Sequence, residues 1–488
     1  MVATTVERTQ PQAASPIRKM EALLERQRRV FLSEGPPSAE LRIDRLDRLV
    51  SGVIDNESRI LDACVTDFGH RSRDISRWTE VAAIVESAKY CKKNLREWMR
   101  PEKRSSTFPL GLLGAKSEVR YQPLGVVGIV SPWNFPVYLA FGPLTGVLAA
   151  GNRAIIKPSE VTPATSEVLA DIIRRAFAET EVAVVTGGPD IGAAFTALPF
   201  DHLVFTGGTS IGKHVMRAAA DNLVPVTLEL GGKCPVVVGK DADLDEVALR
   251  VMNGKCMNAG QICLSPDYVF VHEARRDALV DAMRRAVSAM YDGLRDNPDY
   301  TSIVNERHRK RIQGYLDDAK KKGARLVELN PKGESFEGQT NTNKLPPTLV
   351  LDPSEDMVIM REEIFGPAMP IKTYRHVDEV IDYVNAHDRP LALYYFGDDD
   401  DERERVLTRT TSGGVTVNDV VLHVAQEDLP FGGVGPSGMG RYHGREGFYA
   451  FSHAKAVFTQ SPVSTLGKML RPPYGTVFRS FVSSLIRR

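Results

Sequence analysis

Residues 202–232 read HLVFTGGTSIGKHVMRAAADNLVPVTLELGG, and this stretch decides the fold. The apolar runs at its two ends, 202–205 and 224–230, predict buried strands. The segment between them predicts a helix, so the two strands should lie parallel and be joined by a crossover. Parallel sheets bind ligands at the carboxyl ends of their strands. We therefore expect the glycine turn 207–212 and Glu229 to lie at a ligand-binding edge.

The same alternation of short apolar runs and amphipathic segments extends on both sides of this stretch. The strand candidates are 126–130, 154–157, 182–185, 236–238, 268–271, 348–350 and 414–417. The helix candidates are 167–180, 274–291, 308–322 and 377–386. The chain has 488 residues, too many for one ordinary core, and the pattern restarts after Gly231-Gly232. We therefore predict an α/β fold with two doubly wound, Rossmann-like lobes and an active site between them.

The composition excludes several classes of protein. Lysine plus arginine equals aspartate plus glutamate, at 62 each, so no charge excess favours nucleic acid binding. The five cysteines form no C-x-x-C pair, which indicates free thiols in a reducing compartment, with neither a disulfide framework nor a metal site. The first thirty residues show no secretory signal, and no apolar run is long enough to span a bilayer. A cytoplasmic location fits these limits.

The glycine turn can be compared with two known nucleotide-binding motifs. Residues 205–213, FTGGTSIGK, follow a strand and open a helix, so their backbone N–H groups could meet a pyrophosphate. A P-loop requires Ser or Thr after its lysine, but His214 follows Lys213. The dinucleotide fingerprint G-x-G-x-x-G is absent here, and its occurrence at 433–438 lacks a preceding strand. Taken alone, the turn could also be no more than a helix cap.

Cys263 and Glu229 could form the centre of a covalent mechanism. Cys263 follows the turn residues Gly260 and Gln261, whereas the other four cysteines lack a polar cradle. Taken alone it could be a small buried apolar residue, but as a nucleophile it should have a pKa lowered by a nearby helix N-terminus. Glu229 lies between two leucines, where burial would raise its pKa and make it a base. A thiol and a remote carboxylate suit an oxidising enzyme that forms and hydrolyses a thioester.

Two further polar residues lie at strand ends. Asn134, in SPWNFP at 131–136, is flanked by two prolines and could be an oxyanion donor or an ordinary turn asparagine. Lys157 ends a strand in KPSE at 157–160 and could bind a ribose or form a surface turn. An explanation without a catalytic or binding role is adequate for each of these residues taken alone. It explains much less well why all of them occur together in one chain.

Together the motifs resemble those of the aldehyde dehydrogenase superfamily. The segments SPWNFP, KPSE, FTGGTSIG, LELGGK, GQICLSP and EEIFGP stand in that family's order and approximate spacing, from about residue 121 to residue 452. Residues 431–440, FGGVGPSGMG, resemble the class 3 branch, as do residues 442–444. Residues 424–430, VAQEDLP, are most similar to coniferyl aldehyde dehydrogenases.

The resemblance implies a role for each of these positions. Cys263 would attack the aldehyde, Glu229 would activate the water that releases the acid, and Asn134 with the Cys263 N–H would hold the oxyanion. The residues implied to contact NAD, or alternatively NADP, are Trp133, Lys157, Glu160, Gly207, Gly212, Glu363 and Phe365. The residues that flank the reacting atoms and could line an apolar substrate channel are Phe135, Met257 and Ile262.

The expected substrates are aromatic aldehydes such as coniferaldehyde, or apolar aldehydes of medium to long chain, which would be oxidised to acids. Glu160 would repel a 2′-phosphate, which favours NAD over NADP. Two alternatives stay open. An acylating enzyme would hand the thioester to coenzyme A and would not need Glu229. A non-catalytic binding or structural protein could keep the fold, although the intact Cys263 and Asn134 disfavour it.

The resemblance also implies how the chain is divided. The expected parts are residues 1–104 and 124–231 for NAD(P) binding, 232–431 for catalysis, and 105–123 with 448–462 for oligomerisation. An exposed strand edge in the oligomerisation element favours a homodimer. Residues 463–488 form a basic amphipathic tail, which could dock on the protein or make weak peripheral contact with a membrane surface.

Overall fold

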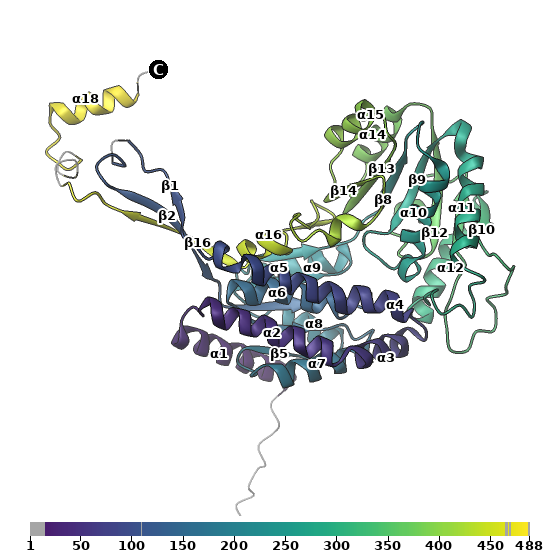
Figure 1. The fold of residues 1–488 in the computed structure, drawn as a ribbon, viewed down its shortest axis with the longest axis horizontal. Helices are drawn as coiled ribbons and strands as arrows, with labels where there is room; N and C mark the ends of the chain where they lie inside the picture. Colours follow the sequence, from purple (N-terminus) through teal and green to yellow (C-terminus); the bar gives the residue numbers. More distant parts are fainter. Residues whose placement is uncertain (1–14, 109, 464–466, 468–469, 487–488) are drawn as a thin grey trace, which may run out of the picture.

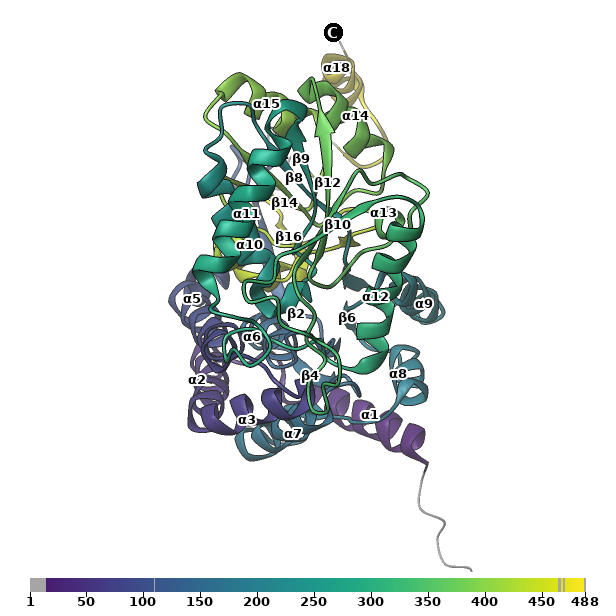
Figure 2. The same ribbon diagram turned by 90° about the vertical axis from the view of Figure 1, so that its right-hand side faces the viewer.

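The computed structural model describes residues 15–108, 110–463, 467 and 470–486. Within these residues the chain forms a six-stranded sheet, a seven-stranded sheet and a three-stranded sheet. The two larger sheets lie one above the other in Figure 2, whereas the small sheet projects from the side of the molecule in Figure 1. This arrangement confirms the predicted α/β class with two Rossmann-like sheets.

The six-stranded sheet has the order β15-β7-β6-β3-β4-β5, and all of its strands but β15 run parallel. The strands are β3 (Val126–Val130), β4 (Arg153–Lys157), β5 (Val182–Val184), β6 (His202–Thr206), β7 (Val226–Glu229) and β15 (Gly438–Met439). Side chains alternate between faces, since Val127 and Ile129 join one apolar cluster and Val126 joins another. Burial on both faces explains why these strands are continuous apolar runs in the sequence.

Helices cover both faces of the six-stranded sheet, and each buried aliphatic side chain in them contributes about 1.5–3 kcal/mol of apolar burial. Their bounds are α1 (Pro16–Glu34), α2 (Ala39–Asp55), α3 (Glu57–Phe68), α4 (Arg73–Ser76), α5 (Ala83–Trp98), α6 (Tyr138–Ala150), α7 (Pro163–Ala176), α8 (Pro189–Thr196) and α9 (Thr209–Ala220). A π-helical turn at Arg77–Ala82 joins α4 to α5. Helices α1, α8 and α9 pack on one face, and α2, α5, α6 and α7 pack on the other.

The seven-stranded sheet has the order β10-β11-β12-β9-β8-β13-β14, with only β10 antiparallel to its neighbour. Its strands are β8 (Cys234–Val238), β9 (Pro266–His272), β10 (Arg325–Glu328), β11 (Thr348–Leu351), β12 (Ala368–Tyr374), β13 (Ala392–Phe396) and β14 (Gly414–Val417). Strands β7 and β8 follow each other in the chain but belong to different sheets. The pair Gly231-Gly232 therefore connects the two sheets, as the sequence indicated.

The remaining helices surround the seven-stranded sheet or precede the small one. They are α10 (Leu244–Cys256), α11 (Arg276–Met290), α12 (Glu306–Lys321), α13 (Val358–Arg361), α14 (Val377–Ala386), α15 (Asp400–Arg409) and α16 (Gly444–Ala450). Short 3-10 helices occupy Met257–Gly260, Glu273–Arg275 and Leu422–Ala425. The predicted helix 167–180 starts and ends earlier, because α7 begins at Pro163 and ends at Ala176.

The sequence prediction missed two strands in the interior of the seven-stranded sheet. Strand β12 contains Pro370, a residue that normally argues against a central strand because it cannot donate to the ladder. Strand β13 is the short run ALYYF just after Pro390-Leu391, which was not among the strand candidates. Both lie between other strands, so tertiary burial outweighs the weak local signal.

The small sheet has the order β1-β2-β16, all antiparallel, and projects away from the larger sheets (Figure 1). Its strands are β1 (Glu102–Arg104), β2 (Lys116–Pro123) and β16 (Ser452–Thr459). The outer edge of β16 has no strand partner among the described residues. Most β16 side chains are exposed.

Helix α18 (Thr476–Leu485) lies beside the far end of the small sheet in Figure 1. Its apolar residues Val477 and Leu485 are 70% and 61% exposed. Lys468, Arg487 and Arg488 of the predicted basic tail lie outside the described residues. In the described part of the chain no helix is both long and apolar enough to cross a membrane.

Candidate active site

The three residues predicted to carry the chemistry come from different parts of the fold. Glu229 is the last residue of β7, in the six-stranded sheet. Cys263 lies in the turn before β9, in the seven-stranded sheet, and Asn134 lies between β3 and α6. The structure brings them together, because Asn134 bonds to the turn of Cys263 and the charge of Glu229 acts on the thiol of Cys263.

A closed set of hydrogen bonds fixes the loop 257–265, which carries Cys263. The side-chain amide of Asn134 donates to the carbonyl of Gln261 (3.1 Å). In return, the side-chain amide of Asn258 donates to the carbonyl of Asn134 (3.1 Å). The Gln261 side chain donates to the carbonyl of Asn258 (2.9 Å). Because each amide has a partner of its own, the loop and the Asn134 segment hold one relative position.

The prediction of a lowered pKa for Cys263 is wrong. No helix begins at this residue, and burial instead raises the pKa of the thiol to about 12. The nearby carboxylates of Glu363 and Glu229 raise it further. The half-buried thiol is therefore protonated at neutral pH until a base or a new charge changes its surroundings. The remaining cysteines are buried as expected, at positions 64, 91, 234 and 256.

Glu229 is buried and has no hydrogen-bond partner for either carboxylate oxygen within the described chain. Burial raises the pKa of this carboxyl well above 4.5, and the charge of Arg441 only partly opposes it. Residues 433–438 follow no strand, as predicted, but they fold back beside β7, so that Gly438 pairs with Glu229. A Cβ added to Gly432 would lie 3.1 Å from Glu229 Oε1. Glycine backbone at positions 432 and 438 therefore packs directly against Glu229.

Glu363 and Phe365 belong to the segment that joins α13 to β12. The connection between the sheets passes so close to Glu363 that a Cβ on Gly231 would lie 2.2 Å from its Oε2. Burial raises the pKa of Glu363 to about 8, and its Oε1 has no partner among the described residues. The Trp133 ring meets Phe365 edge-on at 5.3 Å and His308 at 4.8 Å. These side chains form an aromatic wall close to an acid with an unpaired oxygen.

The glycine turn leaves the amino end of α9 open. The N-cap residue Gly208 supplies no side-chain cap, and a Cβ there would meet nothing within 4 Å. The first N–H groups of α9 therefore lack a side-chain cap and lie next to open space at Gly208, which suits a phosphate group. At Gly212 a Cβ would lie 2.6 Å from Leu230, so the glycine allows α9 to pack closely against the chain after β7. At Gly207 the clash would be with the ring of Phe205.

Lys157 and Glu160 stand together at the end of β4. The Lys157 side chain is buried, and its Nζ donates to the carbonyl of Pro158 (2.8 Å). Glu160 Oε2 lies 3.4 Å from the same Nζ. A buried ammonium beside a partly exposed carboxylate can donate to and accept from a sugar diol. The open α9 terminus, this pair and the unpaired oxygen of Glu363 all fit a dinucleotide.

The residues expected to line a substrate channel lie close to the thiol and to Asn134. Phe135 and Ile262 are 9% and 6% exposed, and Met257 and Cys263 pack on the same apolar cluster. Phe135 directly follows Asn134, and Ile262 directly precedes Cys263. Apolar side chains therefore flank both candidate groups.

Three polar aromatic residues near the thiol were missed. The Tyr138 hydroxyl, at the start of α6, lies 3.3 Å from Nε2 of His443, which directly precedes α16. Burial raises the pKa of Tyr138 and of Tyr442, and a charge on Cys263 contributes to both shifts. The adjacent residues 442–443 belong to a motif used for the class 3 resemblance, which could have indicated them. Tyr138 gives no such signal.

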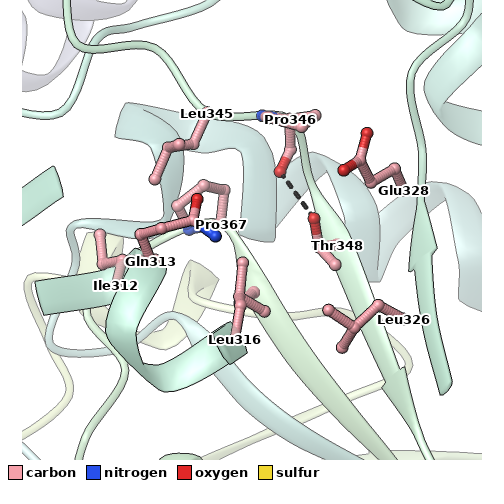
Figure 3. Close-up of a pocket in the computed structure, with 10 residues that line it drawn as sticks. Ile312, Gln313, Leu316, Leu326, Glu328, Leu345, Pro346, Thr348 and Pro367 are labelled. Carbon is pink, nitrogen blue, oxygen red and sulfur yellow. Dashed lines mark hydrogen bonds between the residues drawn. The ribbon is translucent and has the colours of Figure 1, made fainter. Parts of the chain in front are cut away.

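A separate small cavity, of about 60 Å³, lies between α12 and strands β10 and β11 (Figure 3). Its walls are mainly apolar, including Leu316 and Leu326, and Thr348 donates to the carbonyl of Pro346 at its rim. Glu328 is its only ionisable lining residue. None of the residues predicted to carry the chemistry lines this cavity.

Comparison with known proteins decides the family, since the profile of the aldehyde dehydrogenase family matches residues 19–457. The chain belongs to this family. A "Probable coniferyl aldehyde dehydrogenase" of Caulobacter vibrioides is 56% identical over 471 residues, which cover 96% of this chain and 97% of that protein. The coniferyl aldehyde dehydrogenase of a Pseudomonas species is 53% identical over 468 residues, with 96% of each chain covered.

The same conclusion follows from a solved structure. The substrate-bound state of AldH from Staphylococcus aureus matches this aldehyde dehydrogenase with a TM-score of 0.89 at 36% identity, and covers 96% of this chain and 99% of that one. This aldehyde dehydrogenase thus oxidises an aldehyde to a carboxylic acid with NAD(P) as the hydride acceptor. The alternatives of an acylating enzyme and of a non-catalytic protein are not favoured.

Proposed function

We propose that Cys263 is the nucleophile of this aldehyde dehydrogenase, that Glu229 activates the hydrolytic water, and that Asn134 helps to hold the oxyanion. The observation that carries this proposal is a buried carboxyl, that of Glu229, which has no hydrogen-bond partner among the described residues and lies near a protonated thiol. Such a carboxyl serves no structural bond, so it is free to exchange protons with water or with the thiol.

The proposed steps balance in the following way. Cys263 releases its proton to solvent, and the sulfur adds to the aldehyde carbon while the carbonyl oxygen becomes an oxyanion. The side-chain amide of Asn134 and the backbone N–H of Cys263 donate to that oxygen. Bound NAD(P) would supply the hydride acceptor, so that a thioester would remain on the Cys263 sulfur. Glu229 then takes a proton from water, and hydroxide adds to the thioester. The carbon–sulfur bond breaks to release the acid, and Glu229 returns its proton to the Cys263 thiolate.

We further propose which residues bind the dinucleotide. The open terminus of α9 at Gly207-Gly208 would receive the pyrophosphate, and Lys157 with Glu160 would hold the adenine ribose. The Glu160 carboxylate would repel a 2′-phosphate, which supports NAD as the preferred form. Trp133, Glu363 and Phe365 would border the nicotinamide end.

We propose an aromatic aldehyde such as coniferaldehyde as the substrate. The two relatives above carry that substrate in their names, and the apolar residues Phe135, Met257 and Ile262 around the thiol would favour an aryl group over a small aldehyde. Steady-state kcat/KM for coniferaldehyde, octanal and acetaldehyde tests the proposal, with coniferaldehyde expected to give the highest value. A clear preference for acetaldehyde would contradict it, and the same assay with NADP in place of NAD tests the cofactor.

We propose that β16 pairs with a second copy of the chain, because its outer edge is unpaired within the described residues and its element projects from the molecule. The division of the chain into parts with boundaries at residues 104, 123, 231, 431 and 462 also stays a prediction. The tail would dock on its own core or on the partner or, less strongly, on a membrane surface. The enzyme would be cytoplasmic, with five free thiols. Co-sedimentation with anionic liposomes should be compared for the full chain and for a chain ending at Ser461. Equal co-sedimentation of the two chains would contradict docking on a membrane surface.

A further inference from the structure

A fully buried ion pair lies behind the Asn134 segment. Arg71 precedes α4, Glu80 lies in the π-helical turn before α5, and both side chains have 0% exposure. Arg71 Nη2 lies 2.7 Å from Glu80 Oε1. The rings of Phe68 and Phe135 cover the guanidinium at 4.8 and 5.2 Å. The pair is therefore shielded from water, in part by Phe135, one of the residues expected to line the substrate channel.

The second oxygen of Glu80 holds the start of α6. Its Oε2 accepts from the backbone N–H of Val137 (3.0 Å) and from that of Tyr138 (2.9 Å). Helix α6 has no side-chain cap of its own and no acid in its first turn. Glu80, from a different helix, thus supplies both the missing cap and the negative charge that a helix amino end favours. In Figure 1, α5 and α6 run side by side, as this contact requires.

The segment between β3 and α6 is consequently held from two sides. On one side Asn258 and Gln261 bond to Asn134, and on the other Glu80 bonds to Val137 and Tyr138. The amide of Asn134 lies between these two anchors. If the second anchor moves, the amide can turn with the segment while its bond to the Cys263 loop stretches.

We propose that the Arg71–Glu80 pair is a positioning device that fixes the Asn134 amide where the oxyanion forms. The inference rests on the proposed role of Asn134. A buried ion pair adds little to stability compared with apolar residues of the same size, so a structural need alone does not account for it. An anchor for an oxyanion donor does, because a misplacement of about 1 Å can reduce a rate by about 10²-fold.

The test compares two reactions of Cys263 in the full-length enzyme without nucleotide. Hydrolysis of p-nitrophenyl acetate adds the sulfur to a carbonyl, expels p-nitrophenolate and passes through an oxyanion. Alkylation by iodoacetamide displaces iodide at a saturated carbon and forms no oxyanion. The variant R71M/E80Q removes both charges at similar volume and should fold. The matched control R45M/E181Q removes a largely buried pair that joins α2 to the chain before β5.

In R71M/E80Q, ester hydrolysis should fall at least tenfold while the alkylation rate stays within about twofold of wild type. In R45M/E181Q the rates of ester hydrolysis and of alkylation should change by the same factor. In an Asn134→Ala background, removal of the Arg71–Glu80 pair should cause no further loss of ester hydrolysis. Equal changes in both reactions, or the same loss with and without Asn134, would overturn the inference.

One more outcome separates this inference from the proposed function. If Asn134→Ala alone hydrolyses the ester at the wild-type rate, the proposed oxyanion role of Asn134 is wrong and the positioning role falls with it. If Asn134→Ala is slow but R71M/E80Q is not, only the positioning role is wrong.

Discussion

Glu80 and Glu229 are both buried carboxyls close to the Asn134 segment, yet their surroundings are opposite. Glu80 has an arginine on one oxygen and two backbone N–H groups on the other. Glu229 has no hydrogen-bond partner among the described residues. Glu80 is thus held by a charge and by two backbone N–H groups and can fix the backbone, whereas the oxygens of Glu229 bond to nothing in the described chain and suit the proposed exchange of protons. The two surroundings therefore suit different tasks, with Glu80 holding the start of α6 and Glu229, as proposed, moving protons.

The largest effect should come from Glu229→Gln. Without a base for water, steady-state aldehyde oxidation should fall by about 10²–10⁴-fold. A pre-steady-state burst of reduced cofactor should persist, because hydride transfer precedes hydrolysis. Rapid-mixing absorbance of the reduced nicotinamide measures both phases. Loss of the burst together with turnover would show that Glu229 acts before the thioester forms.

The free energy of unfolding should be affected more by substitution of Glu80 than by substitution of Glu229. Glu80→Gln leaves the buried Arg71 charge without its partner, so the free energy of unfolding should fall by about 3–5 kcal/mol. Glu229→Gln breaks no bond and should change it by less than about 1 kcal/mol or raise it. Urea unfolding at neutral pH measures both. Equal losses in the two variants would remove the distinction between the two acids.

Stability should also depend on pH through Glu363. Its folded pKa of about 8 lies above the ordinary value of 4.5, so the folded chain binds this proton more tightly than the unfolded chain. The resulting stabilisation is complete below pH 4.5 and is lost as pH rises toward 8, at up to about 1.4 kcal/mol per pH unit. Urea unfolding across this pH range should show a flatter profile for Glu363→Gln than for wild type. Parallel profiles would contradict the raised pKa.

The smallest effect concerns the thiol in the free enzyme. With a pKa of about 12, the thiolate fraction of Cys263 is small and rises about tenfold per pH unit below that value. Iodoacetamide alkylation without nucleotide should therefore accelerate up to about pH 9 without levelling off. Mapping of the alkylated peptide identifies the site, and Cys263→Ser provides the control. A plateau near neutral pH would indicate an activated thiol.

Much of the fold and of the candidate site could be predicted from local sequence. The strands at 126–130 and 202–206 are apolar on both faces, and residues such as Cys263 and Glu229 lie in motifs with a fixed order. The pKa of Cys263 could not be predicted, because it depends on burial and on Glu363, which lies far along the chain.

The burial of the Arg71–Glu80 pair could not be predicted from the sequence either. Its residues lie in a region whose pattern indicates packing helices, where charged side chains are expected to face solvent. Only the three-dimensional packing of α5 against α6 places them inside. Tyr138 was missed for the same reason, since its neighbour His443 comes from a distant segment.

Gly260 lies where the loop bearing Cys263 packs against the stretch that bears Glu363 and Phe365. It follows Asn258 and Ala259 in the left-handed region, with φ of 48°, 53° and 74° along the three residues. A Cβ at Gly260 would lie 2.3 Å from the carbonyl oxygen of Gly366. One methyl group there would push the stretch bearing Glu363 outward, so the absence of a single carbon atom sets how closely the loop bearing Cys263 packs against that stretch.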